Sequence, residues 1–298
     1  MGAELAKAYP AAQSVFSEVD EALGQDLSKL MWDGPEADLT LTENAQPALM
    51  AVSLATMRVL SETKGVPLAG RVAYVAGHSL GEYSALAAAG AISLADTARL
   101  LKIRGRAMQA AVPVGEGAMA ALLGADLAQA QALARAASEG EVCEAANDNA
   151  PGQVVISGAR TAIERAVALA PKFGARRAVL LPVSAPFHCA LMQPAAEAMR
   201  EALAGVEIKP PVVPLIANVL AAPISEPEAI RARLVEQVTG MVRWRETMGF
   251  LATNGVTTVY EVGAGRVLTG IARRFDGIDA KSVGTPDELE AAAAAIQS

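Results

Sequence analysis

Residues 71–89 read RVAYVAGHSLGEYSALAAA. The apolar run 71–76 predicts a short buried strand, and the alanine-rich run 82–89 predicts a helix. Between them, residues 77–81 form a Gly-x-Ser-x-Gly sequence, which in this strand-turn-helix context is typical of a nucleophile elbow. Its glycines allow a tight turn, and the helix N-terminus offers free N–H groups to an anion. The stretch predicts an α/β protein with Ser79 as nucleophile; a merely tight turn is the alternative.

A serine nucleophile needs a base, and the chain has two histidines. His78 directly precedes Ser79 on the tight turn, so we expect its ring to point away from the hydroxyl and to pack or stabilise the turn. His188 is then the candidate general base, with a purely structural histidine as the alternative. We expect the N–H of Leu80, at the start of the helix, to donate to an oxyanion.

The helix predicted over residues 93–111 carries an arginine on its apolar side. At about 100° per residue, Arg104 falls in the middle of the face opposite the polar stripe. An arginine buried there must find an anion, because an unpaired buried charge costs several kcal/mol. A guanidinium grips a carboxylate with two parallel hydrogen bonds, so either a structural acid or a substrate carboxylate fits.

The order of predicted elements changes between residues 115 and 184. The pattern there predicts a β-α-β-β-α-β order, which is ferredoxin-like; its segments are 117–123, 126–138, 142–147, 153–158, 160–173 and 177–183. Strands alternate with helices on either side, which predicts a mainly parallel sheet covered on both faces. We therefore expect a large α/β domain over 1–113 and 185–298, interrupted by a small domain over 114–184.

Composition narrows the class of protein. The chain has 298 residues and a net charge of −7, with a pI near 5.1, which argues against general affinity for nucleic acid or anionic lipid. No apolar stretch reaches the roughly 20 residues that a membrane helix needs, and the first residues do not resemble a secretory signal. Cys143 and Cys189 lie far apart without metal-type spacing. We expect a cytoplasmic monomer.

Seven segments, in order along nearly the whole chain, resemble the malonyl-CoA:acyl carrier protein transacylases of fatty acid synthesis, which are related to polyketide synthase acyltransferase domains. Colinear matches of this kind are far more specific than any one motif. The segments are 44–48 (NAQPA), 77–86 (GHSLGEYSAL), Arg104-Gly with Met108-Gln, 117–121 (GAMAA), Asn149 with 151–155 (PGQVV), 188–192 (HCALM), and 261–263 (EVG) with 267–270 (VLTG).

The resemblance implies a hydrolase-like parallel-sheet core with an inserted ferredoxin-like small domain. It implies Ser79 as nucleophile, His188 as base and Arg104 as the clamp on the malonyl carboxylate. In this family a main-chain carbonyl orients the histidine in place of an acid, and the matching position is Gln237. Matching positions also place Met108 and Asn149 in the substrate site.

Two side chains resemble those of the malonyl-selective members. Leu80 lies within the elbow, and Phe187 precedes the histidine, where its bulk disfavours an α-methyl group. The resemblance therefore favours malonyl over methylmalonyl.

The implied reaction moves a malonyl group from malonyl-CoA to the phosphopantetheine thiol of acyl carrier protein through a malonyl-serine, without metal or redox cofactor. Carrier protein is acidic, so we expect a basic docking patch; the candidates are Lys172, Arg176, Arg177, Arg273 and Arg274. For each of them, ordinary solvated surface charge is the alternative.

The resemblance leaves two alternatives, because relatives begin with a strand and a Gly-Gln-Gly-Ser-Gln loop that precede the position of Met1. That loop supplies the second oxyanion donor, so we expect a start upstream of Met1. One alternative is an acyltransferase-like scaffold that lacks activity without the loop. The other is a serine thioesterase or hydrolase, which shares the elbow and the base.

Overall fold

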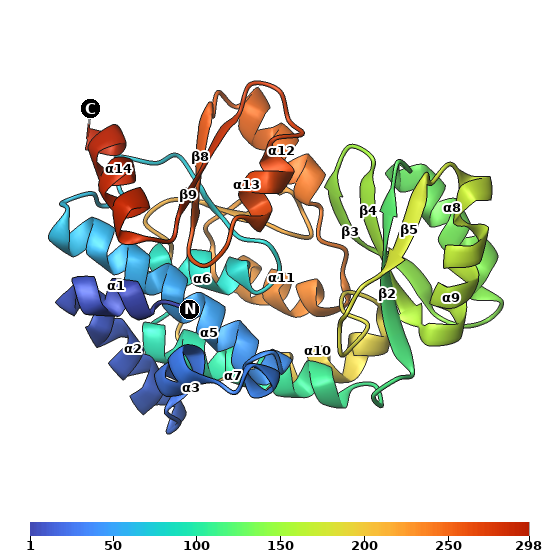
Figure 1. The fold of residues 1–298 in the computed structure, drawn as a ribbon, viewed down its shortest axis with the longest axis horizontal. Coiled ribbons are helices and arrows are strands. Elements are labelled where there is room, and N and C mark those ends of the chain that lie inside the picture. Colours follow the sequence, from blue (N-terminus) through green and yellow to red (C-terminus); the bar gives the residue numbers. More distant parts are fainter. Residues whose placement is uncertain (298) are drawn as a thin grey trace.

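The computed structural model describes residues 1–297 and has a mixed α/β fold, as the sequence pattern predicts (Figure 1). The α-helices are α1 Ala3–Ala8, α2 Pro10–Leu23, α3 Leu27–Asp33, α4 Glu36–Leu39, α5 Thr42–Arg58, α6 Gly81–Ala88, α7 Leu94–Ala110, α8 Leu127–Ser138, α9 Arg160–Leu169, α10 Gln193–Ala204, α11 Pro227–Thr239, α12 Trp244–Thr253, α13 Val267–Ala272 and α14 Pro286–Gln297. Short π or 3₁₀ turns are η1 Val59–Thr63, η2 Ala170–Phe173 and η3 Ala190–Met192. The strands are β1 Val75–Ala76, β2 Gly117–Leu123, β3 Cys143–Ala150, β4 Gln153–Ala159, β5 Arg177–Leu180, β6 Leu215–Ala217, β7 Ala222–Ile224, β8 Thr258–Val262 and β9 Asp279–Val283.

Helices α5 and α7 pack against each other in the largest hydrophobic core. Ser93 caps α7, since its side chain accepts a hydrogen bond from the N–H of Asp96. The two helices approach closely at Gly105, where a Cβ atom would lie 2.5 Å from the Cα of Glu43. Gly105 therefore sets the spacing between α5 and α7, and it directly follows Arg104 on α7.

We expect Gly105→Ala to lower the free energy of unfolding by about 1–3 kcal/mol, because overpacking forces the two helices apart. Thermal and denaturant unfolding measure the effect. Gly249→Ala on α12 is the matched control, since a Cβ at Gly249 meets nothing within 4 Å. Relief of glycine entropy in a helix should make that control neutral or slightly stabilising. A Gly105→Ala protein as stable as the control would contradict the close approach.

Two small sheets contain the parallel strands. In the order β1-β6-β7, β1 pairs parallel to β6 with Val75 opposite Leu215, and β7 is antiparallel to β6. Strand β8 pairs parallel to β9. The strand predicted over 71–76 is confined to its last two residues, and β7 and β9 were not predicted. A strand of two or three residues, such as β1 or β7, forms only where tertiary pairing selects it, so sequence periodicity detects it poorly. Strand β9 has five residues but only two apolar ones, Ala280 and Val283, which is a weak strand signal.

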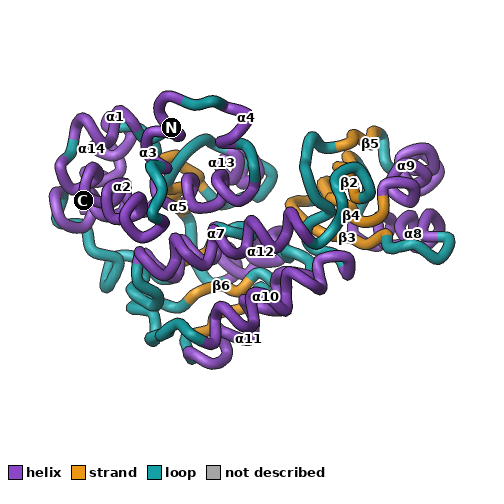
Figure 2. Tube along the Cα trace, turned by 90° about the horizontal axis from the view of Figure 1, so that it is seen from below, coloured by secondary structure: helices purple, strands orange, loops and turns teal. Residues whose placement is uncertain are grey.

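A four-stranded antiparallel sheet forms from the middle of the chain, in the order β3-β4-β2-β5. Its elements follow one another as the pattern of residues 115–184 predicts. Helices α8 and α9 cover one face and enclose a separate apolar core (Figure 2). The sheet with these helices stands apart from the helices near the N-terminus in Figure 1.

Backbone hydrogen bonds at Val242 connect this sheet to the rest of the chain. The Val242 N–H donates to the carbonyl of Ala146 at 2.9 Å, and its carbonyl accepts from the N–H of Asp148 at 2.9 Å. Strand β3 is thereby held beside the segment that follows α11. Asn149, one residue further on, is brought next to the turn between β1 and α6.

Candidate active site

The turn from β1 into α6 has the geometry of a nucleophile elbow. Ser79 adopts φ 53°, a left-handed backbone that is uncommon for a residue with a side chain. A Cβ at Gly77 would lie 1.9 Å from the carbonyl oxygen of Gly81, so only glycine fits there. Asn218 fastens the turn: its Oδ1 accepts from the Ser79 N–H at 2.7 Å, and its Nδ2 donates to the Gly77 carbonyl at 2.7 Å.

The structure brings Ser79 and His188 together although 109 residues separate them. Ser79 Oγ lies 2.7 Å from His188 Nε2, and His188 Nδ1 lies 2.8 Å from the main-chain carbonyl oxygen of Gln237. A carbonyl oxygen only accepts, so the proton resides on Nδ1 and leaves Nε2 free to accept from Ser79. This is the arrangement that a serine nucleophile and its general base require.

His188 is held in the neutral form. Its side chain is buried, with 4% of the residue exposed. Burial lowers the pKa of His188 to about 3, and the nearby positive charge of Arg104 adds to the effect. An imidazole that is neutral at pH 7 can take up the Ser79 proton.

Arg104 lies in the same site and has no carboxylate partner within residues 1–297. Its residue is 1% exposed. Nη1 donates to Gln46 Oε1 at 2.7 Å; Nη2 donates to Gln237 Oε1 at 2.8 Å and to Ser79 Oγ at 3.2 Å. Its guanidinium also lies 5.7 Å from the centroid of the Tyr83 ring. A structural ion pair, one of the two predicted environments of Arg104, is therefore absent from the described part of the chain.

The other predicted site residues surround this group. The N–H of Leu80 makes no hydrogen bond with the described residues, so it is free to donate. The buried sulfur of Met108 accepts from Gln46 Nε2 at 3.8 Å. Phe187 precedes His188 and packs against two of the apolar clusters. Asn149 is buried beside His78.

His78 turns away from the nucleophile, as predicted. Its Nε2 lies 2.8 Å from Asn149 Oδ1, and its ring lies 5.5 Å from that of Trp244. Burial lowers the pKa of His78, which favours the neutral ring. Asn149 therefore contacts the histidine of the elbow, and the hydrogen bonds of the described residues do not join it to Ser79 directly.

Two polar residues of the site, Gln46 and Asn218, were not given roles from the sequence, and for Gln237 only the main-chain carbonyl was given one. The side-chain amide oxygens of Gln46 and Gln237 accept hydrogen bonds from Arg104, and Asn218 Oδ1 accepts one from the N–H of Ser79 in the elbow. Gln46 lies within the NAQPA segment, and a buried amide in an apolar helix was the available signal. Asn218 follows a three-residue strand and gave no signal in the sequence.

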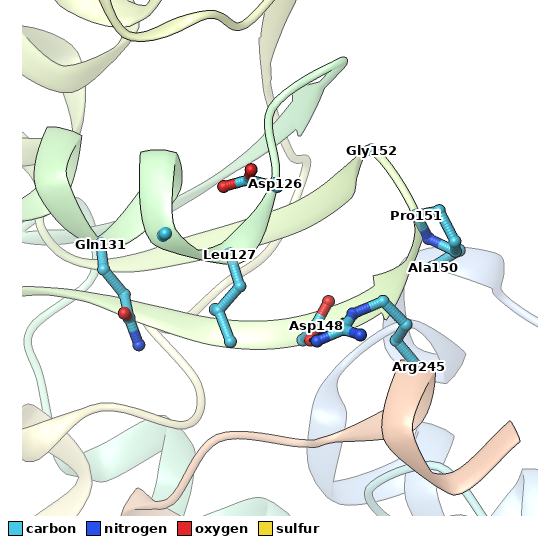
Figure 3. A pocket seen from close by; sticks show the side chains of 9 residues that line it. Asp126, Leu127, Gln131, Asp148, Ala150, Pro151, Gly152 and Arg245 are labelled. Carbon is cyan, nitrogen blue, oxygen red and sulfur yellow. Dashed lines mark hydrogen bonds and ion pairs between the residues drawn. The ribbon is translucent and has the colours of Figure 1, made fainter. Parts of the chain in front are cut away.

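A separate hollow of about 520 Å³ lies between α8, the β3–β4 turn and α12 (Figure 3). Asp148 and Arg245 point toward each other in it, and Arg245 Nε donates to Asp148 Oδ2 at 2.8 Å. Asp148 is the neighbour of Asn149 on β3, and neighbouring strand residues project to opposite faces. Neither Ser79 nor His188 lines this hollow.

Within residues 1–297, no group of three His, Cys, Asp or Glu side chains is arranged to hold a metal ion, and no helix is both long and apolar enough to cross a membrane. The site contains the Ser79 hydroxyl, hydrogen-bonded to neutral His188, and the free N–H of Leu80 next to it. The buried guanidinium of Arg104 lies 3.2 Å from the same hydroxyl oxygen. This set suits acyl transfer with an acyl group that carries a negative charge.

Comparison with known proteins defines the class. The family of acyl transferase domains matches residues 1–285. The malonyl CoA-acyl carrier protein transacylase of Escherichia coli K12 is 44% identical over 98% of this chain and 94% of its own length, and that of Bacillus subtilis 168 is 44% identical over 98% and 91%. The chain belongs to the acyl transferase family and, within it, to the malonyl CoA-acyl carrier protein transacylases, as the resemblance in its motifs indicated.

Solved structures agree with this assignment. The acyl-carrier-protein S-malonyltransferase of Bartonella henselae superposes with a TM-score of 0.97 at 56% identity, covering 100% of this chain and 95% of that one. A malonyl-transacylase solved in complex with a type II polyketide acyl carrier protein superposes with a TM-score of 0.94 at 42% identity, covering 99% and 94%.

Proposed function

We propose that this protein transfers the malonyl group of malonyl-CoA to the phosphopantetheine thiol of acyl carrier protein, and so supplies fatty acid biosynthesis. The observation that carries the proposal is the 2.7 Å contact between Ser79 Oγ and His188 Nε2, with Arg104 Nη2 3.2 Å from the same oxygen. The relatives named above carry this activity in their names.

The reaction proceeds in two half-reactions. In the first, His188 Nε2 takes the Ser79 proton as Oγ attacks the thioester carbonyl, and the N–H of Leu80 donates to the oxyanion. The C–S bond then breaks, and His188 returns the proton to the departing CoA thiolate. In the second, the carrier thiol gives its proton to His188 and attacks the malonyl-serine; Ser79 leaves and recovers a proton from His188.

The Gln237 carbonyl holds the tautomer of His188 throughout. It accepts from Nδ1–H and stabilises the imidazolium that forms in each half-reaction, the role that an acid has in other serine enzymes. No acid side chain is needed at this position.

Arg104 selects the acyl group. Its Nη atoms donate hydrogen bonds to the neutral amide oxygens of Gln46 and Gln237. The positive charge of Arg104 is therefore not neutralised by a carboxylate of the chain and can pair with a substrate carboxylate that binds beside Ser79. Met108 helps to place Gln46, and Asn149 fixes the ring of His78 beside the elbow. Phe187, next to His188, disfavours an α-methyl group, so malonyl is preferred to methylmalonyl.

We further infer a hydrolase-like core over 1–113 and 185–298 with a ferredoxin-like insertion over 114–184. The antiparallel order β3-β4-β2-β5 under two helices supports the insertion, and the β1-turn-α6 elbow supports the core. Cys143 and Cys189 are buried free thiols, which agrees with a reducing, cytoplasmic location.

The test follows malonyl from malonyl-CoA to purified holo carrier protein by intact-protein mass spectrometry. We expect the malonyl mass on the carrier thiol, and free malonate only at a much lower rate. Malonate released without carrier loading would establish the hydrolase alternative. A folded chain that neither forms an adduct nor loads the carrier would establish the inactive scaffold.

A further inference from the structure

A buried acid, Glu82, lies on the helix that follows the nucleophile. Glu82 is in the first turn of α6, three residues after Ser79, and is 1% exposed. Its Oε2 accepts from Gln237 Nε2 at 2.7 Å and from the N–H of Asn218 at 3.2 Å. Its Oε1 is buried and has no partner among residues 1–297. Buried polar atoms are rarely left unpaired, so this oxygen requires an explanation.

One amide side chain joins this acid to the arginine of the site. Gln237 Nε2 donates to Glu82, while Gln237 Oε1 accepts from Arg104 Nη2 at 2.8 Å. Glu82 is also the carboxylate whose charge acts on Arg104. In the free site it is therefore the counter-charge of a buried cation that has no direct ion pair.

Both protonation states of Glu82 are accessible near neutral pH. Burial raises the pKa of Glu82 to about 7, against the hydrogen bonds from Gln237 and Asn218 and the charge of Arg104, which lower it. The ionisable groups that face it are Arg104 on α7 and Tyr83 on its own helix. Its contacts with α11 and with the loop after β6 are to neutral Gln237 and Asn218, and no ionisable side chain of α5, β1 or β6 acts on it.

We propose that Glu82 takes up a proton when a malonyl carboxylate binds Arg104. As a carboxylate it balances Arg104 in the free site; once the substrate carboxylate supplies that charge, Glu82 becomes a neutral acid. The proton comes from solvent and binds Oε1, so both hydrogen bonds to Oε2 survive. Glu82 is thus a positioning residue that couples the acyl group to the elbow, and this inference depends on the proposed role of Arg104.

The sign of the pH dependence follows from linkage. Neutralising Arg104 removes an effect that lowers the pKa of Glu82, so that pKa rises on binding. A group that gains a proton on binding makes affinity fall as pH rises between its free and bound pKa values, by up to about tenfold per pH unit. Below the free value, near pH 7, Glu82 is protonated in both states and affinity levels off.

The experiment is calorimetric titration of the Ser79→Ala protein, in which no acylation occurs, at pH 7.5 in buffers of different ionisation enthalpy. Acetyl-CoA, which lacks the second carboxylate, is the reference ligand. We expect malonyl-CoA to bind more tightly and to take up about half a proton more than acetyl-CoA, with affinity falling from pH 7 to 8.5. Glu82→Gln, made in the same Ser79→Ala background, mimics the neutral acid and should remove the extra proton uptake and the fall in affinity with rising pH. Glu236→Gln, on the exposed side of α11, should keep both of these effects.

The outcomes distinguish a failure of the role proposed for Glu82 from a failure of the role proposed for Arg104. Tighter binding of malonyl-CoA with the same proton uptake as acetyl-CoA overturns the role of Glu82 alone. Equal affinities for the two ligands overturn the role of Arg104 and this inference with it. The titration without the Glu82 substitution decides the matter even where Glu82→Gln does not fold.

Discussion

We expect brief incubation with malonyl-CoA to leave a malonyl adduct on the unsubstituted chain and none on Ser79→Ala. The Ser79 hydroxyl oxygen forms the ester. Among the described residues, no other side-chain oxygen is hydrogen-bonded to His188 Nε2. Removing the nucleophile of a serine enzyme typically costs about 10⁴-fold or more in rate. Intact-protein mass spectrometry measures the adduct, and transfer to the carrier protein measures the rate.

Ser84→Ala is a suitable control for this prediction. Ser84 lies on the same helix, α6, and its buried hydroxyl has no partner among the described residues. Its removal should leave the adduct intact. An adduct that persists in Ser79→Ala would show that another residue carries the acyl group, and the mass of peptides after digestion would identify that residue.

Replacing Arg104 with glutamine should change which acyl group is transferred. Losing one partner of a buried charge pair typically costs about 2–5 kcal/mol, so kcat/KM for malonyl-CoA should fall by about 30- to 4,000-fold. Acetyl-CoA has no carboxylate to lose, and its transfer should fall much less or rise. The measurement is the ratio of kcat/KM for the two thioesters.

Arg106→Gln is the matched control, because Arg106 lies on the same helix but points to solvent and pairs with Glu43. Exposed ion pairs contribute little, so both thioesters should be transferred as before. Parallel losses for malonyl-CoA and acetyl-CoA in Arg104→Gln would instead mean that Arg104 holds the elbow together through Gln46 and Gln237. That result would contradict its role as the carboxylate clamp.

Features that depend on neighbours along the chain could be read from the amino-acid sequence. The strand-turn-helix context of residues 77–81 identified the elbow, because glycine spacing and a following helix are local properties. Helical periodicity placed Arg104 on an apolar face, and the structure buries it. Having two histidines left His188 as the partner of Ser79, and the structure places the two side chains 2.7 Å apart. The roles of all these residues remain predictions.

The surroundings of Arg104 became known from the folded structure and not from the sequence. Periodicity shows that a side chain is buried but not which atoms meet it, so a structural acid and a substrate carboxylate stayed equal alternatives for Arg104. In the structure, the side-chain amides of Gln46 on α5 and Gln237 on α11 contact Arg104. These two residues lie 58 and 133 positions from Arg104 in the sequence. The chain of contacts from Glu82 through Gln237 to Arg104 joins three helices, and strands as short as β1 and β7 exist because neighbours pair with them. Such contacts depend on chain segments that meet only after folding, and no local pattern encodes them.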